Sequence, residues 1–251
     1  MKISAIVLTK NSEELIKDCL ESLKWANEII LVDDSSKDQT IEIAKSRGAK
    51  VFTFSGDFSK KRNFGAKKAQ GEWLLYVDAD ERVTPFLRKE IQAIVSTPLP
   101  VYSGYAIRRR NIFLGREMHW GGWWPDYVVR LMKKDSLLGW EGELHEQPKV
   151  EGEIGKLREA LTHTSHRSLT EMVDKTNEWS EIEAKLLYKA HHPKMTWWRF
   201  LSAGWREFSE RGIKKLGFLD GTVGVIEIIY QSFSRMITYA KLWEMQLGEK
   251  K

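Results

Sequence analysis

The sequence is poor in cysteine, in long apolar runs and in long basic runs, and each shortage excludes a class of protein. Only one cysteine, Cys19, occurs among 251 residues, so no internal disulfide can form, and this usage fits a reducing cytosol. The apolar run at residues 3–8 is too short for a transmembrane helix and lacks a signal-peptide cleavage pattern. The densest basic run, residues 108–110, is too short for a nucleic-acid arm. We therefore expect neither a disulfide scaffold, nor a membrane-spanning protein, nor a nucleic-acid partner.

Glycine-rich phosphate loops are also missing. No Gly-x-Gly-x-x-Gly pattern follows the apolar run at residues 3–8, and no Walker loop occurs anywhere, which disfavours dinucleotide enzymes and P-loop enzymes. The 42% of hydrophobic residues is ample for a core, and the net charge of +5 is compatible with phosphorylated ligands or anionic lipid. The length allows one large domain, or one domain with an appendage.

Four apolar runs alternate with segments of helical periodicity in the first half of the chain. Gly48 and Gly71 end two of the helical segments. Alternating strands and helices with short connections predict an α/β fold, with a mostly parallel sheet and helices on both faces. The expected strands are residues 3–8, 28–32, 50–54 and 73–77, and the expected helices begin near residues 12, 40, 58 and 85.

Three carboxylates, Asp78, Asp80 and Glu81, follow the buried strand at residues 73–77 directly. Ligands of open α/β sheets bind just outside the carboxyl ends of the strands. Asp78 and Asp80 are two residues apart, so in an extended chain both point to one side. Two hard oxygen ligands so placed suit Mg²⁺ or Mn²⁺, with diphosphate oxygens completing the shell. The alternative is a strand that ends in a solvated acidic turn.

Polar residues also follow the first two strands. Asp33 comes directly after the second strand, where it can accept a hydrogen bond from a base or a ribose. Arg62 or Lys61, on the helix that begins near residue 58, can face a diphosphate. A polar turn and a solvated helix face are the respective alternatives.

Four motifs together resemble the family 2 glycosyltransferases of the GT-A fold: residues 9–11, 33–35, 62–63 and 78–81. Their order and spacing match the nucleotide-sugar domain of that family over roughly residues 1–150. The resemblance implies inversion at the anomeric carbon, a divalent metal and a nucleoside-diphosphate sugar as donor, with a UDP-hexose expected.

The same resemblance implies roles for single residues. It assigns Asp33 to the base, Asp78 to the ribose and the metal, and Asp80 to the metal. The residues expected to bind the nucleotide-sugar are Thr9, Asn11, Glu13, Asp33, Arg62 and Asp78.

Residues 111–125 are rich in glycine and tryptophan, a composition that predicts loops. Flat aromatic faces near a carboxylate site are suited to stacking on a sugar, so Trp120, Trp123 and Trp124 are expected to bind the acceptor. Arg130 joins them because it points opposite to its apolar neighbours on the strand that follows. Packing of these tryptophans in an aromatic core is the alternative.

Residues 140–146 resemble the Trp-x-Gly-x-x-His-Glu motif of family 2 enzymes that act on lipopolysaccharide core and related cell-surface glycans. Inverting transfer needs one base to take the proton of the acceptor hydroxyl. We rank Glu146 above Glu143 for this role, with Glu141 last, and expect His145 to donate to the diphosphate or complete the metal shell. The Glu-Asp acceptor motif common in the family is absent, and a surface hairpin is the alternative.

The C-terminal third reads as helical. His163 precedes it, with a contact to the diphosphate or a role in the core as alternatives. Residues 194–215 combine tryptophan, bulky apolar residues and basic residues, which predicts an element lying in a membrane interface. Burial of these tryptophans against the helix over residues 223–247, or in a homodimer interface, competes with that view.

We therefore predict a catalytic domain over residues 1–160, with a donor half at 1–95 and an acceptor half at 96–160, and a helical region over 161–251. The expected protein is a cytoplasmic inverting hexosyltransferase, peripheral at the inner face of the cytoplasmic membrane. Its expected acceptor is a glycan or lipid-linked molecule such as lipopolysaccharide core. A nucleotidyltransferase, or an inactive glycan- or lipid-binding module on the same fold, remains the alternative.

Overall fold

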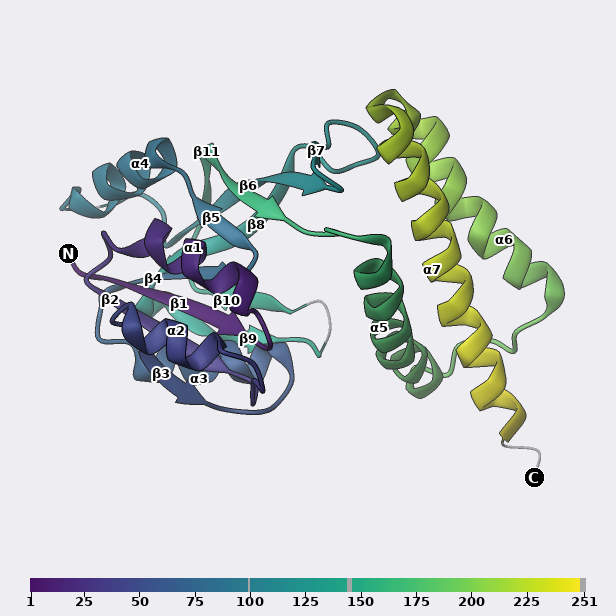
Figure 1. The fold of residues 1–251 in the computed structure, drawn as a ribbon, viewed down its shortest axis with the longest axis horizontal. Helices are drawn as coiled ribbons and strands as arrows, with labels where there is room; N and C mark the ends of the chain where they lie inside the picture. Colours follow the sequence, from purple (N-terminus) through teal and green to yellow (C-terminus); the bar gives the residue numbers. More distant parts are fainter. Residues whose placement is uncertain (99, 144–145, 249–251) are drawn as a thin grey trace. The chain divides into compact units, whose positions relative to one another are not determined.

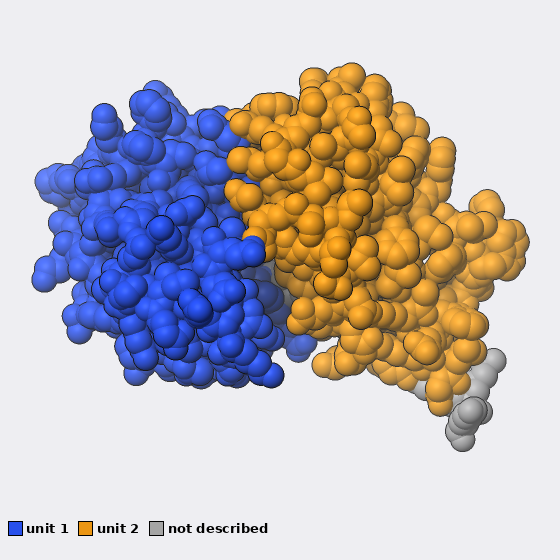
Figure 2. Space-filling model, viewed as in Figure 1, with its two compact units in different colours: residues 1–110, 126–163 blue, residues 111–125, 164–251 orange. Residues whose placement is uncertain are grey.

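The structure, a computed structural model, describes residues 1–98, 100–143 and 146–248. It divides into two compact units, which Figure 2 shows in different colours. Unit 1 comprises residues 1–110 and 126–163, and unit 2 comprises residues 111–125 and 164–251. Unit 1 contains a sheet with helices on both faces, which confirms the predicted α/β class, and unit 2 is mostly helical (Figure 1).

The large sheet has the strand order β3-β2-β1-β4-β8-β6-β11-β5, with β7 paired to β6. Strands β3, β2, β1 and β4 are parallel, and the pairs β4–β8, β6–β8, β6–β7 and β11–β5 are antiparallel. A separate two-stranded sheet pairs β9 with β10. The strands are β1 (Ile3–Thr9), β2 (Glu28–Asp33), β3 (Lys50–Thr53), β4 (Trp73–Asp78), β5 (Glu81–Val83), β6 (Gly104–Phe113), β7 (Arg116–Glu117), β8 (Asp126–Lys133), β9 (Leu137–Glu141), β10 (Gln147–Val150) and β11 (Ile154–Thr164).

The register of the parallel strands fixes where the site can lie. Thr9 is opposite Asp33 on β2, and Leu8 is opposite Asp78 on β4. The three strands therefore end together, and the polar residues predicted after them meet at one edge of the sheet.

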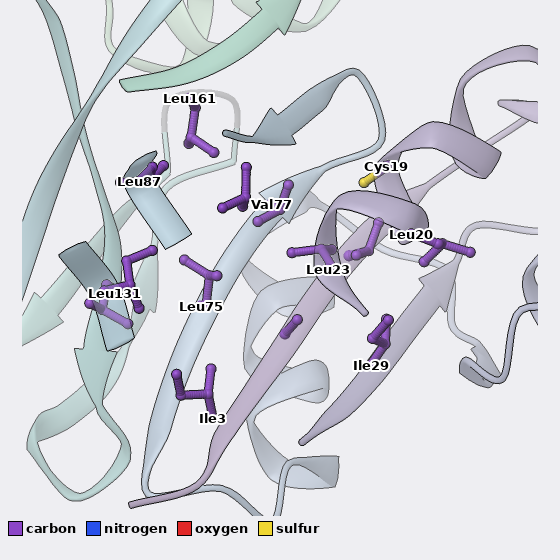
Figure 3. Packing of buried hydrophobic residues seen from close by; sticks show 14 of the residues in the cluster. Ile3, Cys19, Leu20, Leu23, Ile29, Leu75, Val77, Leu87, Leu131 and Leu161 are labelled. Atoms are coloured by element: carbon purple, nitrogen blue, oxygen red, sulfur yellow. The ribbon is translucent and has the colours of Figure 1, made fainter. Parts of the chain in front are cut away.

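Alternating side chains of β1 divide the core of unit 1 between the two faces of the sheet. Ala5 and Val7 pack in one cluster with residues of α1, α2 and α4, part of which is drawn in Figure 3. Ile6 and Leu8 pack in a second cluster with α3 and with Trp140 of β9. The helices are α1 (Glu13–Leu23), α2 (Thr40–Ser46), α3 (Phe58–Lys68) and α4 (Pro85–Ser96).

The helical part of unit 2 contains, within the described residues, three α-helices and two short helical turns. A π-helical turn (Ser209–Lys214) and a 3-10 turn (Gly217–Asp220) connect the second helix to the third. Gly204 lets the second helix approach the third closely, because a Cβ at this position would lie 2.8 Å from the sulfur of Met236. The helices are α5 (Leu169–Lys189), α6 (Trp197–Phe208) and α7 (Gly221–Gly248).

One expectation about the middle of the chain needs correction. Residues 111–125 are not loop throughout, since they include the end of β6 and the short strand β7. They lie in unit 2 together with residues 164–251. The reason is the buried carboxylate of Asp220, which accepts hydrogen bonds from the backbone N–H groups of His119 and Trp120. Strand β11 was not predicted.

Candidate active site

Asp78, the last residue of β4, lies between two arginines. Its Oδ1 is 3.0 Å from Nη2 of Arg62 on α3, and its Oδ2 pairs with Arg130 on β8. Both arginines are buried, with exposed fractions of 2% and 4%. Burial alone would raise the pKa of Asp78, but Arg130 and Arg62 outweigh it and hold that pKa well below its usual value. Asp78 is therefore ionised at neutral pH.

Glu81 ties this cluster to the backbone. Its buried carboxylate accepts from the backbone N–H of Asp78 at 3.0 Å and from Arg130 at 2.9 Å. Arg130 was predicted to bind an acceptor, but its guanidinium lies inside this cluster. Burial would lower the pKa of Arg130, and the neighbouring Asp78 and Glu81 raise it instead. This placement favours a role in holding the acids in position.

Arg62 also holds Glu146, the predicted base. Nε of Arg62 is 2.8 Å from Oε1 of Glu146, and its guanidinium lies 4.7 Å from the ring centroid of Trp140. Glu143, the second-ranked base, is exposed. Of the two ranked acids, the structure thus brings Glu146 into contact with the Asp78 cluster and leaves Glu143 at the surface.

Asn63 positions the hairpin that carries Glu146. Its Nδ2 donates to the carbonyl of Trp140 at 3.0 Å, and its Oδ1 accepts from the N–H of Trp140 at 2.9 Å. The Arg-Asn pair of α3 therefore acts twice: Arg62 binds the carboxylates, and Asn63 fixes β9 beside them. Local sequence pattern does not indicate the second contact, because it joins residues 77 positions apart.

Asp80 lies beside His163, a residue for which the sequence left a contact to the diphosphate or a role in the core open. Nε2 of His163, near the end of β11, is 3.4 Å from Oδ2 of Asp80. His145, the predicted third metal ligand, lies outside the described residues. Among the residues that the structure describes, no group of three or more His, Cys, Asp or Glu side chains could hold a metal ion. Asp80 and His163 nevertheless form a carboxylate and imidazole pair whose donor chemistry suits Mn²⁺ or Mg²⁺ completed by ligand oxygens.

The loops after β1 and β2 are joined by side chains that were predicted to bind the nucleotide. Oδ1 of Asn11 accepts from the N–H of Lys37 at 2.8 Å, and Oε2 of Glu13 accepts from the N–H of Gln39 at 2.9 Å. Asn11 and Glu13 thus shape the loop between β2 and α2.

Thr9 and Asp33 are buried members of the predicted nucleotide-binding set. The buried carboxylate of Asp33 accepts from the backbone N–H of Ser36 at 2.9 Å. Within the described chain, the buried hydroxyl of Thr9 and Nη1 of Arg62 have no hydrogen-bond partner. Buried polar atoms usually have partners, so these two atoms point to a ligand at this edge of the sheet.

The tryptophans predicted to bind an acceptor all lie in unit 2. Trp123 packs against Phe113 with ring centroids 4.7 Å apart, and the guanidinium of Arg211 lies 4.7 Å from its ring centroid. Trp124 is partly buried and precedes a cis peptide bond to Pro125. Trp120 is exposed. Trp123 therefore packs within unit 2, as the aromatic-core alternative held, and Trp120 presents the most open ring of the three.

Comparison with known proteins places this geometry in a family. Residues 4–139, more than half of the chain, match the sequence profile described as Glycosyl transferase family 2. The chain belongs to this family. The match covers the strand ends that carry Thr9, Asp33, Asp78 and Asp80, and it confirms the prediction of a family 2 glycosyltransferase.

Two relatives illustrate the reach of the similarity. An uncharacterized glycosyltransferase of Rickettsia typhi is 29% identical over 99% of this chain and 89% of its own length. A lipopolysaccharide core biosynthesis glycosyltransferase, LpsC, of Rhizobium meliloti is 25% identical over 73% of this chain and 71% of its own length. The similarity to the first therefore extends through unit 2.

Two solved structures share the fold. TarS residues 1–349 of Staphylococcus aureus, in complex with UDP-GlcNAc, aligns with a TM-score of 0.53 and 17% identity, covering 99% of this chain and 92% of that one. The mannosyltransferase PcManGT of Pyrobaculum calidifontis, in complex with GDP-Man and Mn²⁺, aligns with a TM-score of 0.53 and 12% identity, covering 100% and 88%. These likenesses support the GT-A fold predicted from the sequence.

Proposed function

We propose that this glycosyltransferase moves a hexose from a nucleoside-diphosphate sugar, with a UDP-hexose as the first candidate, to a cell-surface glycan or lipid-linked acceptor, with inversion at the anomeric carbon. The observation that carries the proposal is the cluster at the carboxyl edge of the sheet, where Arg62 contacts both Asp78 and Glu146. This contact supports the proposal, because the proposed donor-binding acid and the proposed base would share one cation.

The donor would lie along the ends of β1, β2 and β4. Asp33 remains our candidate for the base contact, Asp78 for the ribose, and the unpartnered Thr9 hydroxyl for a further polar contact. Nη1 of Arg62, a buried donor without a partner in the described chain, is suited to a diphosphate oxygen, because guanidinium groups bind phosphate strongly. Asn11 and Glu13 would act by shaping the loop that encloses the nucleotide.

A divalent metal would be held by Asp80 and His163, with Asp78 sharing it or facing the ribose. When bound, Mg²⁺ or Mn²⁺ would stabilise the negative charge of the leaving diphosphate. The complex of PcManGT with GDP-Man and Mn²⁺ supports metal use on this fold. We therefore assign His163, in place of the undescribed His145, as the first nitrogen ligand.

Glu146 is the proposed base. Its carboxylate would accept the proton of the acceptor hydroxyl while that oxygen attacks the anomeric carbon from the side opposite to the diphosphate, which gives inversion. Arg62 orients Glu146 through the bond from Nε, and Asn63 fixes the hairpin that carries it.

The membrane surface is the proposed location of the acceptor. On α6, Trp197, Trp198, Leu201 and Trp205 are exposed, whereas the helix buries small residues such as Gly204. A helix that packs its small residues inward and leaves its tryptophans outward is typical of an element in a membrane interface. No helix of the described chain is long and apolar enough to cross a bilayer.

Two contributions to the free energy of membrane binding would then support peripheral attachment. Apolar side chains entering the headgroup layer gain roughly 25 cal/mol per Å², and each basic residue near anionic lipid adds about 1 kcal/mol. The name of the LpsC relative supports a lipopolysaccharide acceptor. A homodimer that covers the same tryptophans is the competing explanation.

Release of nucleoside diphosphate from a panel of nucleotide-sugars, with and without Mn²⁺, tests the proposal. We expect release from at least one sugar, stimulated by Mn²⁺ or Mg²⁺ and abolished by EDTA. Turnover that survives EDTA would contradict the metal assignment, and no turnover with any sugar, in the presence of lipid extracts as acceptor, would contradict the reaction.

A further inference from the structure

A cavity of about 240 Å³ in unit 2 takes no part in the proposed reaction. It is lined by His192, Arg199, Ser202, Arg206 and Tyr239. Arg199, Ser202 and Arg206 come from α6, at spacings of three and four residues that place them on one side of the helix. Tyr239 comes from α7, and His192 from the segment between α5 and α6. The lining contains two cations and no carboxylate.

The two arginines of this cavity have no acidic partner in the part of the chain that the structure describes. Over residues 1–98, 100–143 and 146–248, no acidic side chain pairs with Arg199 or Arg206, although most other arginines of unit 2 have such partners. Arg211 pairs with Glu207 at 2.5 Å and Arg235 with Glu183 at 2.6 Å. Both guanidinium groups belong to exposed residues on one side of α6, and without acidic partners in the described chain they attract an anion.

The remaining lining groups include hydroxyls that can donate hydrogen bonds to the oxygens of an anion. Ser202 and Tyr239 carry hydroxyl groups, and His192 packs edge-on to Tyr239 with ring centroids 5.4 Å apart. Guanidinium groups bind tetrahedral oxyanions by paired N–H donors, and hydroxyls donate to the oxygens left over. The set matches a phosphate group better than a planar carboxylate.

We propose that this cavity binds a phosphate group. The same helix leaves Trp197, Trp198 and Trp205 exposed, so the headgroup of an anionic phospholipid is the source we expect, with free phosphate as the other source. The site would then fix unit 2 to particular lipids, beyond the general attraction of basic residues for a negative surface. This inference does not rest on the transfer reaction.

The test compares two double variants of the full chain. Arg199→Gln with Arg206→Gln removes the cavity cations, and Lys45→Gln with Lys89→Gln removes the same charge from exposed positions of unit 1. Binding is measured by calorimetry with inorganic phosphate, and by co-sedimentation with phosphatidylcholine vesicles that contain either phosphatidic acid or the same fraction of oleic acid. Oleic acid supplies negative charge without a phosphate monoester.

We expect wild type to prefer the phosphatidic acid vesicles. The arginine variant should bind phosphate or these vesicles about tenfold more weakly or worse, because a hydrogen bond to a charged group is worth more than 1.4 kcal/mol. The lysine variant should bind as wild type does. Binding of inorganic phosphate without a vesicle preference would identify free phosphate as the source.

Two results would overturn the proposal: equal loss in both double variants, or no dependence of either binding reaction on the arginines. Ser202→Glu provides an independent check, since it places a carboxylate in the cavity without removing a cation and should weaken binding as well. Release of nucleoside diphosphate in the absence of lipid should be unchanged in the arginine variant, which separates this site from the catalytic one.

Discussion

The two units differ in the burial of a tryptophan and in the pairing of their arginines. In unit 1, Trp73 is fully buried, and the arginines of the Asp78 cluster each contact a carboxylate. In unit 2, Trp197 is 74% exposed, and Arg199 and Arg206 have no acidic partner in the described chain. The Asp78 cluster of unit 1 thus pairs its charges within the protein, whereas α6 of unit 2 exposes tryptophans and two arginines that have no acidic partner in the described chain.

This difference fits the roles proposed for the two units, which are transfer chemistry for unit 1 and membrane binding for unit 2. Charges that are fixed by mutual contacts, as in the Asp78 cluster, need little reorganisation when a charged substrate reacts. Exposed tryptophans and unpaired arginines suit a surface that is bound reversibly. Variants of both units test this contrast between the Asp78 cluster and α6.

Asp80→Ala should reduce transfer below detection while leaving the fold intact. The variant removes the carboxylate that pairs with His163 and is proposed to bind the metal. Asp135→Ala, at an exposed acid of the same unit, is the control and should keep wild-type activity. Initial rates of nucleoside-diphosphate release, with circular dichroism of both variants, decide the matter. Retained activity in Asp80→Ala would remove the basis for the metal site.

Trp73→Ala should lower the free energy of unfolding by about 3–5 kcal/mol, because it leaves a cavity in the core of unit 1. Trp197→Ala should change it by less than about 0.5 kcal/mol, as is usual for surface positions. Urea titration of both variants measures the contrast. Similar losses would show that Trp197 is buried in solution, for example in a dimer.

Glu146→Gln should lower transfer by about 10²-fold or more, the usual scale for loss of a general base, with little change in donor affinity. The glutamine keeps the size of the side chain but cannot take a proton. Glu143→Gln, on the same hairpin but exposed, should retain most activity. Our ranking of the two acids is wrong if the second variant is the inactive one.

Glu28→Gln should destabilise unit 1 by roughly 2 kcal/mol at pH 7 without a comparable loss of activity per folded molecule. Burial alone would raise the pKa of Glu28, but hydrogen bonds from Lys50, Ser4 and the N–H of Gln70 lower it to about 2. A pKa that is lower in the folded state gives stability that is present above about pH 4.5 and is lost as pH falls toward 2.

Unfolding midpoints of wild type and Glu28→Gln between pH 7 and pH 2 measure this contribution. The difference between the two proteins should shrink as the pH falls through that window. Glu72→Gln, at an exposed glutamate of the same unit, should show no such pH dependence. A constant difference at all pH values would contradict the assignment.

Trp197→Ser with Trp198→Ser should have the smallest effect on stability and activity toward soluble substrates, yet should abolish co-sedimentation with anionic vesicles at low salt. Both side chains are exposed, and their rings pack against each other with centroids 5.5 Å apart. Unfolding of this variant, or failure of wild type to bind vesicles, would instead place these residues in a core or a dimer interface.

The sequence was informative where local pattern decides the structure. Buried runs delimit β1, β2 and β4, so the polar residues at their ends, such as Asp33 and Asp78, could be assigned to one edge of the sheet. His163 could not be placed beside Asp80, because the contact depends on antiparallel pairing of β11 with β5, in which His163 is opposite Glu81. Periodicity within one segment carries no information on such pairing.

The same limit applies to charged side chains inside the fold. Alternation on β8 showed only that Arg130 points away from its apolar neighbours, and a buried position between Asp78 and Glu81 needed the sheet order β4-β8. On α6, composition predicted an element in a membrane interface but not which side of the helix would pack inward. That choice follows from the close approach at Gly204, which no composition rule predicts.

The proposed metal site at Asp80 and His163 can be tested by binding of Mn²⁺ in the presence of UDP, followed by electron paramagnetic resonance of the free ion. We predict that wild type binds Mn²⁺ in a UDP-dependent manner, that Asp80→Ala and His163→Ala both lose this binding, and that Asp135→Ala retains it. Unchanged Mn²⁺ binding in both Asp80→Ala and His163→Ala would contradict the account, because these two side chains are the pair on which the proposed metal and donor site is built.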